Sequence, residues 1–253
     1  MKRTPQERET LKASFQKMSL ADKADYIWTY YKLPITLGLA ALLLLCSTVY
    51  RQVTKKEAVL YSALINVTVG EDLDVQLNEG FVASIGASPQ KSEVSLYRGM
   101  YLSNDPSPEN HQYGYASKLK LMAAIEAKQL DVVLMNREAY DIFSQKGYLL
   151  DLGELLAAEG PLYQTLESQL ITNTVILEDN AIEYSLNEAS RYETVTEETA
   201  NALDVSAYPI FRAAGFSDPV YLGVVGNSLR IPAVLQYIAY LTGAQNEAQS
   251  PTG

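Results

Sequence analysis

The chain has 253 residues, with 20 lysine and arginine residues against 30 aspartate and glutamate residues, so its formal net charge is −10. This acidity argues against nucleic-acid binding, which depends on clustered basic residues. One cysteine excludes a disulfide within the chain and a cysteine-based zinc site, and one histidine argues against a histidine-rich metal centre. We therefore expect no metal, no other cofactor and no nucleic-acid partner.

The first feature along the chain is an uncharged apolar segment, Leu33 to Tyr50, which is 18 residues long. A run of about 20 apolar residues crosses the hydrocarbon core of a bilayer. Aromatic residues such as Trp28 and Tyr31 precede the segment, as in the interfacial belt of a spanning helix. The alternative is a buried core helix, which would carry a polar face that this segment lacks. The pattern predicts a transmembrane helix over residues 33–53.

The distribution of basic residues predicts the orientation of this helix. Residues 1–32 hold seven lysine and arginine residues and the stretch just after the helix holds three, although close to the helix the two sides are nearly balanced. The excess favours a cytoplasmic N-terminus. Since 32 residues precede the apolar run, it does not fit a cleaved secretory signal, whose charged region is short. We expect a single-pass protein of the cytoplasmic membrane, with residues 1–32 forming an inner arm that includes an interfacial helix.

Residues 54–245 are expected to form an α/β domain outside the membrane, and residues 246–253 a disordered tail. Periodicity predicts strands over residues 58–69, 93–102, 130–135, 174–178, 202–205 and 220–225. It predicts helices over residues 72–84, 115–128, 137–145, 152–158, 162–170, 208–214 and 231–241. The polar stretch 180–199 is expected to form a hairpin excursion. This alternation predicts three layers, with a mostly parallel sheet flanked by helices.

Two stretches resemble a known family. Ala116–Leu156 reads as an amphipathic helix, a D-V-hydrophobic strand, a short helix and then G-Y-L-x-D-L-x-x-L. It resembles extracytoplasmic solute-binding proteins of bacterial ABC transporters, and Asp218–Gly243 resembles their closing strand and helix. The aromatic stretch DKADYIWTYYKLPI resembles single-pass proteins of Gram-positive bacteria that carry such a domain. The resemblance implies one lobe of a type 2 periplasmic-binding-protein-like fold, and one lobe cannot close on a ligand about a hinge.

Ligands of open parallel sheets bind beyond the carboxyl ends of the strands. The candidate residues at those ends are Asn66, Thr68, Tyr101, Asn104, Asn136 and Arg137. Asn136 and Arg137 are the best pair, because an amide and a guanidinium at a helix N-terminus suit a polar or anionic ligand. In the alternative reading, Asn136 only caps the helix and Arg137 is solvated. The chain contains no G-x-S-x-G, H-E-x-x-H or Walker pattern, so we expect no catalytic residues and no enzyme.

Two functions follow from these features. The domain is expected to bind a small solute or peptide, or to act as a sensor, on a membrane anchor. Alternatively, it is a ligand-free interaction or scaffolding subunit of a membrane complex. The expected partners are therefore the lipid bilayer together with a solute, a peptide or a membrane protein. An open cleft with convergent polar groups would favour the first function. A filled cleft with exposed apolar surface would favour the second.

Overall fold

The computed structural model describes residues 19–105, 111–180, 185 and 192–244. The chain divides into two compact units, Met1–Lys55 and Lys56–Gly253. The expected tail at residues 246–253 and the first 18 residues of the expected arm lie outside the described residues.

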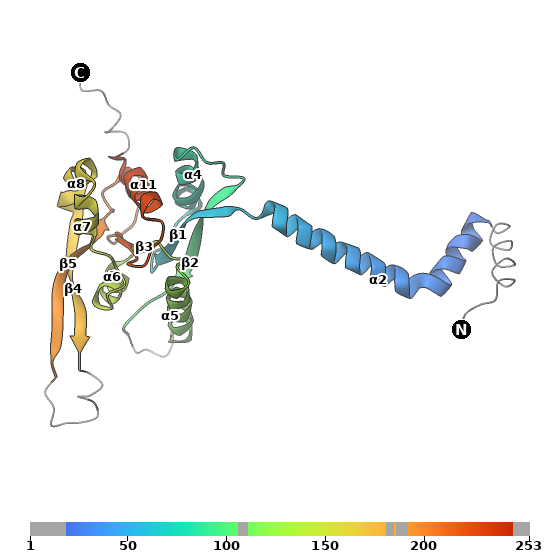
Figure 1. Cartoon of the computed structure of the whole chain (residues 1–253), viewed down its shortest axis with the longest axis horizontal. Helices are drawn as coiled ribbons and strands as arrows, with labels where there is room; N and C mark the ends of the chain where they lie inside the picture. Colours follow the sequence, from blue (N-terminus) through green and yellow to red (C-terminus); the bar gives the residue numbers. More distant parts are fainter. Residues whose placement is uncertain (1–18, 106–110, 181–184, 186–191, 245–253) are drawn as a thin grey trace, which may run out of the picture. The chain divides into compact units, whose positions relative to one another are not determined.

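The described residues of the first unit form helix α2 (Leu20–Thr54), which runs without a break through both the expected arm helix and the apolar segment. Pro34 lies inside this helix and not in a first turn, so one backbone hydrogen bond is missing there. Figure 1 shows α2 bent in its N-terminal part, as proline-containing helices commonly are. Its large apolar side chains from Leu33 to Leu45 are 41–71% exposed within the chain. Within the residues that the structure describes, no helix is both long and apolar enough to cross a membrane.

The second unit is built on a six-stranded sheet with the order β2-β1-β3-β6-β5-β4 (Figure 1). The strands are β1 (Glu57–Ile65), β2 (Ser92–Met100), β3 (Val132–Met135), β4 (Leu170–Asp179), β5 (Thr194–Asp204) and β6 (Tyr221–Val224). Strand β1 is parallel to both of its neighbours, whereas the other three pairings are antiparallel. The sheet is therefore mixed, and the expectation of a mostly parallel sheet was wrong. The physical reason is that β4 and β5 pair as the two arms of a hairpin, and β6 returns between β3 and β5 in the opposite direction.

Helices cover both faces of this sheet, which gives the expected three layers. Alternate residues of β1 and β3 enter two separate clusters of buried side chains. One cluster packs against the segments α3 (Glu71–Val75), α4 (Phe81–Ser84), α7 (Leu152–Ala157), α8 (Gly160–Leu166), α10 (Pro209–Arg212) and α11 (Ile231–Thr242). The other packs against α5 (His111–Glu126) and α6 (Arg137–Gln145). A short 3₁₀ turn, Glu167–Gln169, leads into β4. The strand begins at Leu170, four residues before the expected start at residue 174.

The helix expected over residues 72–84 contains a π-helical turn, Gln76–Gly80, between α3 and α4. Tyr237 and Tyr240 of α11 donate hydrogen bonds to the carbonyls of Leu77 and Gln76, at 3.0 and 3.1 Å. A Cβ atom on Gly80 would overlap the Tyr240 hydroxyl. A larger residue at position 80 would therefore force the Tyr240 side chain of α11 to move.

Candidate functional site

The carboxyl ends of β1 and β3 lie side by side at the point where the chain leaves these strands for opposite sides of the sheet. Such a switch point is where open α/β sheets usually bind ligands. Asn66 follows β1 and Asn136 follows β3, and the structure brings these two candidates together. The Asn66 Nδ2 atom donates to Asn136 Oδ1 at 3.2 Å.

Asn66 also joins the ends of β1 and β2. Its Nδ2 donates to the Leu102 carbonyl at 2.6 Å, and its Oδ1 accepts from the Leu102 amide at 2.9 Å. Its backbone is left-handed, with φ at 57°, a conformation that asparagine tolerates better than most residues. This turn also ends β1 at Ile65, four residues before the expected end of the strand at residue 69. The Asn66 amide is therefore engaged by the protein's own backbone.

Asn136 caps helix α6, as the alternative reading held. Its side chain accepts a hydrogen bond from the Ala139 amide at 3.0 Å, and its backbone is extended. The same Oδ1 atom also accepts from Asn66, so both lone pairs of the carbonyl oxygen are used. The polar groups that the sequence placed at the switch point bond to one another across it.

Arg137 is the first residue of α6, and its side chain is 57% exposed. Its guanidinium makes an ion pair with Asp141, with Nε 3.1 Å from Oδ1. It also lies over the rings of Tyr140 and Tyr221, at 5.6 and 5.9 Å from their centroids. These two rings stack on each other at 5.1 Å. Arg137 is thus held by a carboxylate and an aromatic pair as well as being solvated.

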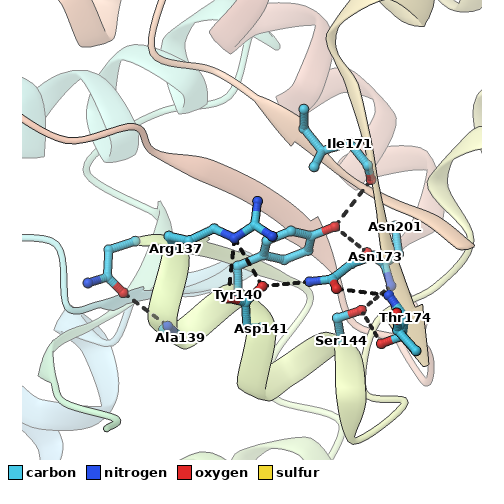
Figure 2. A network of polar contacts seen from close by, with 10 residues as sticks. Arg137, Ala139, Tyr140, Asp141, Ser144, Ile171, Asn173, Thr174 and Asn201 are labelled. Carbon is cyan, nitrogen blue, oxygen red and sulfur yellow. Dashed lines mark hydrogen bonds and ion pairs between the residues drawn. The ribbon is translucent and has the colours of Figure 1, made fainter. Parts of the chain in front are cut away.

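A polar network continues from α6 into the β4–β5 hairpin (Figure 2). The Tyr140 hydroxyl lies 2.8 Å from Asn201 Oδ1 and 3.2 Å from the Ile171 carbonyl, and Asn201 donates to Ser144 at 2.8 Å. Asp141 accepts from Asn173 of β4 at 2.7 Å. Asn201 is fully buried, and burial raises the pKa of Tyr140 above its ordinary value. The network fixes the hairpin to α6.

The sequence analysis did not single out Asn201 or Tyr140. Asn201 falls at a β-bulge, where the pairing skips from Ala202 to Ala200 opposite Ile171 and Thr172. A bulge re-aims a side chain relative to its neighbours. A lone amide in the apolar stretch Ala200–Val205 is the sequence signal that could have indicated a buried polar contact.

The other candidates lie apart from Asn66 and Asn136. Thr68 lines a cavity of about 320 Å³ between the β1–α3 loop and the end of β2. Tyr101 is half-buried, and its ring lies 6.3 Å from that of Tyr113. The backbone amide of Asn104 donates to Glu138 of α6 at 3.0 Å.

The cavity beside Thr68 has one charged pair on its wall. The Arg98 guanidinium forms two parallel bonds with Asp74, of 2.5 and 2.7 Å. The hydrogen bond with Asp74 raises the pKa of Arg98. The rest of the lining includes the apolar side chains of Leu64, Val67 and Val69 together with Thr68 and Glu71. Its walls can therefore contact a small molecule that carries both polar and apolar groups.

In the part of the chain that the structure describes, no group of three or more histidine, cysteine, aspartate or glutamate residues is placed so that it could hold a metal ion. Comparison with protein-family models, curated proteins and solved structures finds no significant match to this chain. The functional argument therefore depends on the geometry of the chain itself.

Proposed function

We propose that this chain is a membrane-anchored protein-interaction subunit whose α/β domain lies outside the cytoplasmic membrane. The observation that carries the proposal is the closed switch point between β1 and β3. Both lone pairs of Asn136 Oδ1, and the donor and acceptor of the Asn66 amide, have partners within the protein. A solute arriving there would have to replace these bonds before making its own.

The proposed anchor is the apolar part of α2. Its described side chains from 33 to 48 carry no charge, and the sequence adds Val49 and Tyr50. Leucine side chains more than half exposed, such as Leu37 and Leu44, are costly in water but not in a lipid or protein environment. The ten basic and four acidic residues of positions 1–56 support an inner N-terminus, against ten basic and 26 acidic residues in the remainder.

The proposed domain has the organisation of one solute-binding-protein lobe. In its favour, α5, β3, α6 and α7 follow one another as the resemblance implies, and β6 and α11 form the expected closing strand and helix. A single lobe offers one half of a ligand cleft. Exposed apolar side chains on α5 and the β4–β5 hairpin instead suit contact with another protein.

Labelling by a membrane-impermeant maleimide tests the anchor and its direction. A Cys46→Ser chain that carries Ala157→Cys, at an exposed site on α7, should react from outside intact cells. A matched chain with Ser14→Cys should react only after permeabilisation. The opposite pattern would contradict the orientation, and release of the chain by high salt without detergent would contradict the anchor.

Solute binding is the second candidate function, because the cavity beside Thr68 is open and has the Arg98–Asp74 pair on its wall. A native-state ligand raises the unfolding midpoint by mass action. A thermal-shift screen of the full chain against amino acids, sugars, short peptides and polyamines tests this candidate. A shift that is lost in Arg98→Gln and kept in Arg212→Gln, an exposed control, would favour solute binding over the interaction role.

A further inference from the structure

Helix α5 has an exposed apolar stripe that nothing in the described unit covers. Tyr115, Leu119 and Met122 are 59, 49 and 41% exposed. At about 100° per residue these positions share one face of the helix. Leu121 and Ala124 lie on the opposite face and are buried against the sheet. The helix is therefore apolar on both sides, and its outer face is a candidate for protein contact.

The β4–β5 hairpin offers an acidic surface that also carries exposed apolar side chains. It extends past the rest of the sheet (Figure 1) and carries Leu177, Tyr192 and Val195, which are 55, 46 and 52% exposed. Around them stand five exposed acidic residues, namely Glu178, Asp179, Glu193, Glu197 and Glu198. The described residues of the hairpin include no lysine or arginine. A hollow with a volume of about 680 Å³ lies between the end of β4 and the start of β5.

The lysines on α5 carry the charge opposite to that of this acidic surface. Lys118 and Lys120 lie on either side of the apolar stripe, both are exposed, and neither forms an ion pair with any residue that the structure describes. The Lys120 ammonium lies over the Tyr97 ring, 5.5 Å from its centroid. Four other exposed cations lie elsewhere on the described part of the domain, namely Lys91, Lys128, Lys146 and Arg212. Among the described residues, three arginines form ion pairs, and an aspartate of the same chain holds each of them, namely Arg98, Arg137 and Arg230. In a strongly acidic domain, α5 thus joins apolar side chains to two lysines that have no carboxylate partner among the described residues, with Glu126 as its one exposed acidic residue.

We infer that α5 of one copy of this chain docks on the β4–β5 hairpin of a second copy. This inference rests on the proposed function, because it names the partner of the interaction subunit. Exposed apolar side chains would be buried on both surfaces, and the two lysines would face the carboxylates. Two such contacts, made reciprocally, close a symmetric dimer and leave neither surface exposed. Since the charges lie at the rim of the contact, salt should weaken it.

Cysteine cross-linking of the full chain in nanodiscs tests this docking. Two differently tagged chains both carry Cys46→Ser. One of them has Leu119→Cys and the other has Val195→Cys, and the two are mixed and treated with a short bis-maleimide. We expect a cross-linked pair that contains both tags, and at least tenfold less when Ala157→Cys, an exposed residue of α7, replaces Val195→Cys. Equal yields would overturn the docking, and so would a product formed mainly between two Leu119→Cys chains.

Charge reversal gives an independent test of the same contact. The pair Lys118→Glu and Lys120→Glu should lower the mixed-tag yield at least tenfold. Glu193→Lys with Glu197→Lys on the other copy should restore the yield. If charge-reversed chains that keep the parental melting temperature show no loss, or no rescue, the docking is wrong.

A third arm separates this inference from the proposed function. The Leu119→Cys chain is cross-linked in the membranes of its source organism. An adduct that contains a different protein and no second copy would refute self-docking and leave the interaction role in place. If neither this chain nor the Val195→Cys chain forms any adduct, both the docking and the interaction role fail.

Discussion

Replacing Asn66 by alanine tests whether the closed switch point is part of the folded structure. The change removes the partners of both the amide and the carbonyl of Leu102, which is only 7% exposed. Leaving a buried backbone group unpaired costs about 1–3 kcal/mol. Alanine at a φ of 57° adds about 1 kcal/mol, because it lacks the short polar side chain with which asparagine tolerates the left-handed region. We expect Asn66→Ala to lower the free energy of unfolding by about 3 kcal/mol in total.

The assay is thermal unfolding of the full chain in detergent, followed by near-ultraviolet circular dichroism of its tyrosines. For a domain of this size, about 3 kcal/mol corresponds to a fall of roughly 6–12 °C in the midpoint. Asn66→Gly is the matched control, since it removes the same hydrogen bonds but accepts the left-handed backbone, and it should lose less. A loss below about 1 kcal/mol in Asn66→Ala would refute the reasoning and restore Asn66 as a residue kept for a ligand.

Three further changes test other parts of the structure. Asn201→Ala should cost about 1–3 kcal/mol in urea unfolding, because the buried Tyr140 and Ser144 hydroxyls lose a partner, whereas a loss no larger than that of the exposed Asn104→Ala would contradict the network. Gly80→Ala should destabilise the chain although alanine normally favours a helix, and the sign should reverse in a Tyr240→Phe background; equal effects in both backgrounds would exclude the proposed overlap. Burial raises the pKa of Tyr140 and of Tyr237 above the ordinary 10.0, so these tyrosines ionise in the unfolded chain before they ionise in the folded one. Their contribution to the free energy of unfolding is therefore complete below pH 10 and is lost above it. Stability should thus fall above about pH 10, and less steeply in Tyr237→Phe; a pH profile that is the same in this variant would count against the assignment.

The sequence predicted most of the helices and strands because their periodicity and caps are local signals. Helix α6 has the expected bounds, Arg137–Gln145, since Asn136 caps it and Gly147 follows it with a positive φ. The pairing of the strands could not be predicted in the same way. The mixed sheet depends on where β6 is inserted, which is decided by contacts between distant parts of the chain such as Val133 and Gly223.

The candidate site was predicted in part. Counting from the strand ends brought Asn66 and Asn136 to one edge of the sheet, and the structure has them in contact. Their partners depend on tertiary structure, because Leu102 reaches Asn66 only after β2 has paired with β1. The buried network of Asn201 was missed because a bulge re-aims this residue, and no period of two reveals a bulge.

The most direct test of the interaction role is the mass of the chain as it exists in its own membrane. The full chain is extracted in a mild detergent, and its protein mass is measured by light scattering after correction for the micelle. We predict a protein mass of at least twice the 28.0 kDa of one chain, which falls at high salt or in the Lys118→Glu, Lys120→Glu variant. A single species with the mass of one chain, at all salt and protein concentrations, would contradict the account.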